Sequence, residues 1–115
     1  MNSKISKDWS YNHFVAFLLL YGAYADLEYS SREKKLILHH VGKDVLDDVE
    51  PQFDVMSEYE QLSLLNHLSK KYITSSQDRQ KVKTLLRELW QSDGEVTFLE
   101  SNLGAFLDKF LELEG

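Results

Sequence analysis

The longest apolar stretch in this sequence is Phe14-Val15-Ala16-Phe17-Leu18-Leu19-Leu20-Tyr21-Gly22-Ala23-Tyr24-Ala25. As an α-helix it would extend about 18 Å, whereas the hydrocarbon core of a bilayer is about 30 Å thick. We therefore expect a helix that begins near Asp8 or Ser10 and ends near Ala25. Because apolar residues occupy most of its sides, this helix should be buried in a protein core and should not span a membrane.

The rest of the chain shows the spacing of amphipathic helices and lacks the alternating apolar and polar runs of half-buried strands. The clearest pattern has apolar residues at i, i+3, i+4, i+7 and i+8: Val82, Leu85, Leu86, Leu89 and Trp90. Further helices are expected over about 30–41, 43–48, 57–72, 76–91 and 97–111. Pro51 argues against one uninterrupted helix through 43–56, so we expect a kink or a restart with Pro51 in the first turn.

Capping residues support these boundaries. Three Ser or Thr residues precede a Glu by three positions, which is the spacing of a capping box. These pairs are Ser30–Glu33, Ser57–Glu60 and Thr97–Glu100. Gly42 is well placed to end a helix in a left-handed conformation. Since no linker divides the chain, the sequence predicts one domain over residues 1–115, with residues 1–8 as a flexible N-terminus. We expect a compact all-α bundle of about six to seven helices.

Composition excludes several classes of function. The sequence has no Cys, which excludes disulfides and thiolate sites and is consistent with a cytoplasmic protein. Its 19 acidic residues against 13 Lys and Arg give a net charge of −6, which argues against a nucleic-acid binder. No P-loop, dinucleotide fingerprint or G-x-S-x-G motif is present. The N-terminus also lacks the pattern of a signal peptide.

An acidic motif follows the first apolar helix and recurs near the end of the chain. Both copies fit D-x-E-x-[ST]-x-x-E: Asp26-Leu27-Glu28-Tyr29-Ser30-Ser31-Arg32-Glu33 and Asp93-Gly94-Glu95-Val96-Thr97-Phe98-Leu99-Glu100. Apolar positions on either side match at the same offset, as Val15 does with Val82. The chain therefore predicts two pseudo-symmetric helix–acidic turn–helix units.

Each motif places an aspartate just past the C-terminal end of a helix, where the helix dipole disfavours negative charge. A bound cation would explain that position. The run from Asp93 to Glu100 also matches the closing half of an EF-hand loop, although the opening acidic positions are missing. Hard oxygen ligands favour a weakly bound Ca²⁺ or Mg²⁺. The alternative is that Glu33 and Glu100 only cap helices and that the remaining residues are ordinary turn residues.

The pairing of A-D-x-E-x-S-x-x-E with S-D-G-E-x-T-x-x-E resembles the TerB-like, tellurite-resistance-associated domains, over about Trp9 to Leu113. The resemblance implies a helical domain with two pseudo-symmetric halves that binds a divalent cation. It also implies a role in bacterial stress response, with membrane-associated protein partners and no catalysis. The implied metal ligands are Asp26, Glu28 and Glu33 in the first copy and Asp93, Glu95 and Glu100 in the second. Leu27 departs from the glycine usual in this family, which favours the second site.

The sequence thus predicts a non-enzymatic, TerB-like interaction domain that binds a cation through its acidic turns. The alternative is a helical interaction bundle in which the acidic residues only cap helices and maintain solubility. A third interpretation, an enzyme with an Asp or Glu as its acid–base group, has no nucleophile or cofactor motif in its favour.

Two further residue groups bear on function. No catalytic or ligand role is expected for the four histidines, His13, His39, His40 and His67. A basic strip is expected to be a solvated helix face: Lys70, Lys71, Lys81, Lys83 and Arg87. If Tyr24 and Tyr29 are exposed beside the first acidic turn, they would mark a partner surface.

Overall fold

A computed structural model describes residues 9–25 and 30–91, apart from the side chains of Ala25 and Trp90. This part of the chain contains helices and no strand: α2 (Tyr11–Ala25), α3 (Ser31–Val41), α4 (Lys43–Asp54), α5 (Glu58–Tyr72) and α6 (Ser76–Gln91). The predicted all-α class is therefore confirmed. The predicted flexible segment 1–8 and the predicted helix 97–111 lie outside the described residues. The count of six to seven helices and the pseudo-symmetry accordingly stay predictions.

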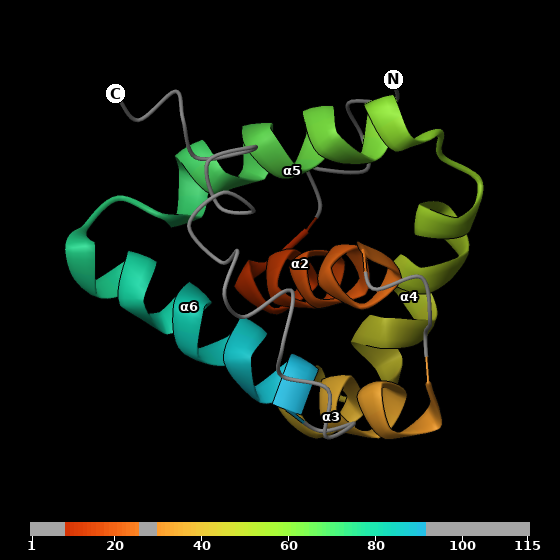
Figure 1. Cartoon of the computed structure of the whole chain (residues 1–115). Coiled ribbons are helices and arrows are strands. Elements are labelled where there is room, and N and C mark those ends of the chain that lie inside the picture. The colour runs from red at the N-terminus through yellow and green to blue at the C-terminus, as the bar shows by residue number, and fades with distance from the viewer. Residues whose placement is uncertain (1–8, 26–29, 92–115) are drawn as a thin grey trace.

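The helix α2 runs through the middle of the bundle, and the other four helices surround it (Figure 1). Five consecutive side chains, from Ala16 to Leu20, have no exposed surface. Successive side chains on a helix point about 100° apart, so burial of five in a row requires neighbours around the whole circumference. The prediction of a helix buried on most sides is confirmed. None of the helices in the described ranges has the length and apolar content needed to cross a membrane.

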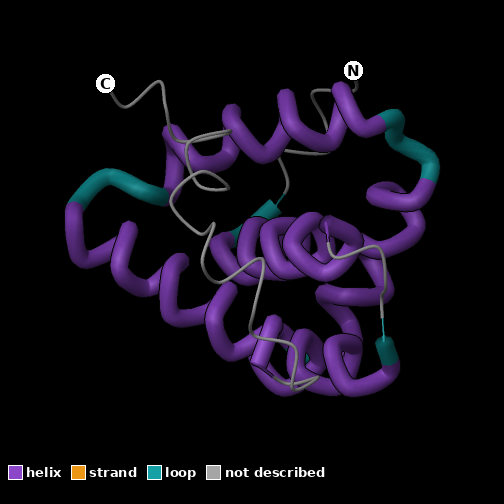
Figure 2. The backbone as a smooth tube through the Cα atoms, in the orientation of Figure 1, coloured by secondary structure: helices purple, strands orange, loops and turns teal. Residues whose placement is uncertain are grey.

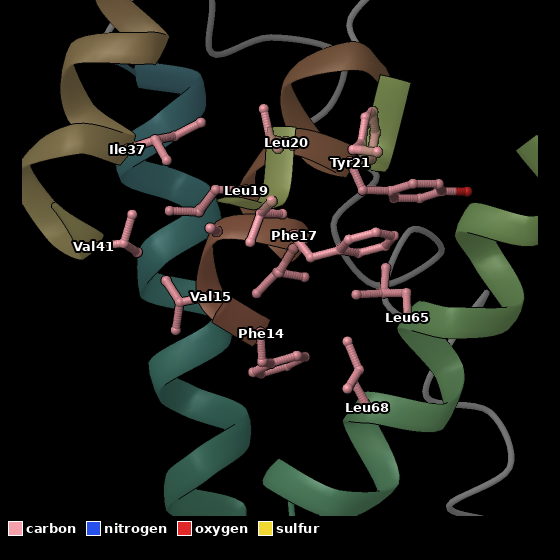
Figure 3. Close-up of a cluster of buried hydrophobic side chains, with 14 of the residues drawn as sticks. Phe14, Val15, Phe17, Leu19, Leu20, Tyr21, Ile37, Val41, Leu65 and Leu68 are labelled. Atoms are coloured by element: carbon pink, nitrogen blue, oxygen red, sulfur yellow. The ribbon is translucent and has the colours of Figure 1, made fainter. Parts of the chain in front are cut away.

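The core has two sides, separated by α2 (Figure 3). Leu19 points toward Ile37 of α3, whereas Phe17 points toward Leu65 of α5. All four side chains are fully buried. The central helix therefore holds α3 and α5 apart while packing against both.

Aromatic contacts fix α2 to its neighbours. Near its start, the ring of Phe14 stacks on Tyr72 of α5 with the centroids 5.3 Å apart. The Tyr72 hydroxyl also donates a 3.0 Å hydrogen bond to the carbonyl of Trp9. Further along, Phe17 meets Phe53 of α4 edge-on at 5.2 Å. Such aromatic pairs contribute about 0.5–1.5 kcal/mol beyond the burial of their area.

The expected end near Asp48 and restart at Pro51 are wrong, because α4 continues through Pro51 to Asp54. Proline cannot donate to the carbonyl of Asp47, but both residues are exposed and water can occupy that acceptor. A proline inside a helix costs about 3 kcal/mol. Three side chains on the opposite face are buried in the core, namely Leu46, Val49 and Phe53. Burial of Phe53, which lies beyond Pro51, contributes about 1.5–3 kcal/mol. Its ring contacts with Phe17 and Tyr24 add about 0.5–1.5 kcal/mol each, and together these contributions offset the cost of the proline.

The helices α3 and α4 are joined by one residue, Gly42, with φ 87° and ψ 159°. Its N–H donates to the Leu38 carbonyl at 2.8 Å, and its own carbonyl accepts from the Leu46 N–H at 3.2 Å. The positive φ agrees with the sequence-based expectation. The extended ψ does not, because it lies far from the left-handed helical region and in a region adopted almost only by glycine.

Substitutions at Gly42 test this backbone conformation. A Cβ there would meet no atom within 4 Å, so the cost is backbone strain alone. Both Gly42→Ala and Gly42→Asn should lower the free energy of unfolding by about 1–3 kcal/mol, measured by urea denaturation. Asparagine is tolerated in the left-handed helical conformation. Wild-type stability in Gly42→Asn together with a loss in Gly42→Ala would therefore contradict the observed ψ.

Candidate functional site

Glu33 is a capping residue at the start of α3 and is the one predicted metal ligand within the described residues. Its Oε1 accepts a hydrogen bond from the backbone N–H of Ser30 at 3.0 Å. In return, Ser30 Oγ accepts from the Glu33 N–H at 3.1 Å. This is the predicted capping box, and it places the Glu33 side chain fully out of solvent. The capping box therefore accounts for Oε1 of Glu33.

The other predicted ligands lie outside the described residues: Asp26, Glu28, Asp93, Glu95 and Glu100. Within 9–25 and 30–91, no group of three or more His, Cys, Asp or Glu side chains is arranged to hold a metal ion. Both acidic turns are largely beyond these ranges. The predicted cation site thus stays a prediction.

A histidine contacts both a serine and an aspartate, as in the catalytic triad of a hydrolase; the three residues are Ser10, His13 and Asp48. Ser10 Oγ is 2.9 Å from His13 Nδ1, and His13 Nε2 is 2.9 Å from Asp48 Oδ2. However, the backbone N–H of Ser10 donates to the same Nδ1 at 3.2 Å, and Ser10 Oγ accepts from the His13 N–H at 3.4 Å. His13 thus takes the place of the glutamate in a capping box at the start of α2. Because the backbone occupies its Nδ1 lone pair, this imidazole is poorly arranged to act as a base toward Ser10.

A groove of about 330 Å³ lies between α2, α3 and α6. Val15 and Leu85 form part of its apolar wall, and His40 and Glu88 stand beside them. His40 Nε2 lies 3.1 Å from Glu88 Oε1, so these two polar groups satisfy each other across α3 and α6. The groove has the size of a small-ligand site, but these two polar groups at its wall are already engaged.

The ends of α2 and α4 and the start of α5 lie on one side of the bundle (Figure 1). An exposed large apolar residue occurs at each of them: Tyr24 in α2, Val55 directly after α4 and Tyr59 in α5. We call Tyr24, Val55 and Tyr59 the junction patch, and their exposed fractions are 41%, 83% and 79%. The sequence marks Tyr24 as a partner contact on the condition that it is exposed, and the structure meets that condition. Tyr29, named with it, lies outside the described residues.

Val55 of the junction patch lies in the α4–α5 connection, at the end of α5 opposite the α5–α6 connection (Figure 2). Hydrogen bonds hold the backbone of this α4–α5 connection. Gln61 Nε2 donates to the carbonyl of Phe53 at 3.1 Å and to that of Met56 at 3.4 Å. Directly after this turn, Ser57 and Glu60 form the predicted capping box. The patch is therefore presented by a braced turn.

Tyr24 in the patch lies near an aromatic ring and near two carboxylates. The Tyr24 ring stacks on Phe53 with the centroids 5.4 Å apart. Partial burial raises the pKa of Tyr24, and the nearby carboxylates of Asp54 and Glu50 raise it further. Burial likewise raises the pKa of Tyr21, with a second contribution from Glu58. These carboxylates are therefore close enough to the tyrosine hydroxyls to affect their ionisation.

The net negative charge of the chain is concentrated in the segment that contains Val55 and Tyr59. Residues 43–60 contain seven acidic residues and a single lysine, whereas the rest of the sequence contains twelve acidic and twelve basic residues. The net charge of −6 thus belongs entirely to α4 and the start of α5. Sequence reasoning missed Val55 and Tyr59, and a count of charge along the chain could have directed attention to this segment.

Comparisons with protein-family models, with curated proteins and with solved structures found no match to this chain. The resemblance to TerB-like domains accordingly stays a prediction.

The two capping boxes provide a matched test of the role of Glu33. Glu60→Ala should lower the free energy of unfolding by about 0.5–1 kcal/mol, because the lost cap is exposed to water. Glu33→Ala should cost more, about 2–3 kcal/mol, because it removes a fully buried side chain and leaves the part-buried N–H of Ser30 without its acceptor. Urea denaturation with and without calcium measures both losses. A calcium-dependent stabilisation of wild type that disappears in Glu33→Ala alone would contradict a purely capping role.

Proposed function

We propose that this protein is a non-enzymatic protein-interaction domain that binds its partner through the junction patch. The observation that carries the proposal is the exposure of Val55 in the braced α4–α5 turn and of Tyr59 in the first turn of α5. Tyr24 contacts the same segment, because its ring stacks on Phe53. Single exposed apolar residues are common on protein surfaces, but a group of them indicates an interaction site. Tyrosine is among the residues that contribute most to protein–protein affinity. A turn that is already ordered also loses little entropy on binding.

Two side chains of types that often act in catalysis have structural roles in this protein, which supports the non-enzymatic part of the proposal. Glu33, a fully buried carboxylate, caps α3. His13, which contacts both a serine and an aspartate, caps α2. Each side chain has a structural role that accounts for its position, so neither requires a catalytic explanation.

Substitution of the patch tests the interaction. Val55 and Tyr59 are mostly exposed, so Val55→Ser/Tyr59→Ser should keep wild-type stability within about 0.5 kcal/mol. Both forms are then used for affinity capture from an extract of cells that encode the protein, with quantitative mass spectrometry. The variant should lose specific partner proteins that the wild type captures. The matched control is Gln77→Ser/Gln80→Ser, which changes two exposed side chains on α6. Equal capture by wild type, patch variant and control would reject the proposal.

The TerB-like interpretation adds a divalent cation, a role in bacterial stress response of the tellurite type, and a partner protein associated with the membrane. Its support is the repeated D-x-E-x-[ST]-x-x-E motif, with Asp93, Glu95 and Glu100 as the ligands in the more complete copy. This proposal is independent of the junction patch, because it concerns residues of the acidic turns.

Calorimetric titration with calcium and magnesium tests the cation. Wild type should bind with a dissociation constant of about 0.1–1 mM, as weak calcium modules do. Asp93→Asn should remove the heat of binding, whereas Asp54→Asn, outside the acidic turns, should retain it. Absence of heat at millimolar metal, with equal melting temperatures for wild type and Asp93→Asn, would eliminate the cation site.

A further inference from the structure

The charges beside the junction patch indicate what kind of partner it binds. Two of the nearby acidic residues already have basic neighbours, since Lys34 pairs with Glu50 at 3.7 Å and Lys43 pairs with Asp47. Asp54, which precedes Val55, and Glu58, which precedes Tyr59, form no ion pair within the described ranges. An apolar partner alone would cover these carboxylates without compensating their charge, which is costly. A partner with positive charge would compensate both.

We infer that the junction patch binds an arginine-containing basic segment of a partner protein, an inference that rests on the proposed function. Arginine fits both features of the surface, because its planar guanidinium can stack on a tyrosine ring while it donates hydrogen bonds to a carboxylate. Tyr24 and Tyr59 provide exposed rings, and Asp54 and Glu58 provide the carboxylates. Lysine matches the charge but lacks the planar group.

The distribution of charge favours this partner over other kinds of macromolecule. A nucleic acid or an anionic membrane would be repelled by a segment that holds the entire net charge of −6. A basic protein segment is attracted by the same field, which also accelerates its association at low salt.

The test uses two fluorescently labelled peptides of equal length, in which arginine or lysine alternates with serine. Fluorescence polarisation with the full chain at low salt should show roughly threefold or tighter binding of the arginine peptide. Asp54→Asn/Glu58→Gln should weaken binding of both peptides roughly threefold to tenfold. Tyr59→Ser should remove most of the preference for arginine. Amide signals of Val55 and Tyr59 should shift in NMR spectra on addition of the arginine peptide.

A control of equal net charge separates this site from general attraction. Asp44→Asn/Glu88→Gln removes two exposed acidic residues, at the start of α4 and on α6, and should weaken binding much less than Asp54→Asn/Glu58→Gln. Equal weakening by the two variants, or equal affinity for the two peptides, would overturn the inference. A dimer in light scattering that Val55→Ser/Tyr59→Ser abolishes would also overturn it, because the occupant would then be a second copy of the chain.

The same variants distinguish the two proposals. If the peptides do not bind but Val55→Ser/Tyr59→Ser still loses its captured partners, the patch is an interaction site and the basic partner is wrong. If capture is unchanged by that variant, the proposed function itself is wrong.

Discussion

The burial of α2 on all sides is the constraint on which the rest of the structure depends. Its fully buried positions from Ala16 to Leu20 need packing partners in every direction, and α3, α4, α5 and α6 supply them. Truncation of one large buried side chain typically costs 2–5 kcal/mol, against a total stability of about 5–15 kcal/mol for a native protein. The arrangement of the surrounding helices is therefore tied to this one element.

Polar groups in the described part of the chain are used mainly to start and hold helices. His13 at the start of α2 and Glu33 at the start of α3 perform the same task with different chemistry, because each satisfies a backbone N–H that the first turn leaves unpaired. His13 also reaches Asp48 and so connects α2 to α4. This use of histidine and buried glutamate shows why residue types associated with catalysis do not by themselves define an active site.

The candidate interaction surface was only partly predictable from the sequence. Tyr24 lies at the end of the apolar stretch, and the excess of acidic residues over 43–60 is visible in the sequence. The exposure of Val55 and Tyr59 was not predictable, because it depends on how Gln61 and the capping box orient the α4–α5 turn. Nor does any local pattern indicate that this turn lies near the end of α2, since that proximity results from packing of Phe53 against Tyr24.

The sequence by itself determined the all-helical class, the central helix and the helix starts at Ser30 and Ser57, because periodicity and capping act within a few residues along the chain. Only the tertiary structure decided that α4 continues through Pro51, since the benefit of burying Phe53 depends on residues far away in the sequence. It also decided that Glu33 is buried and that Asp54 lies near the exposed Tyr24. Burial and exposure are properties of the packed molecule, because they depend on neighbours that only the fold brings together.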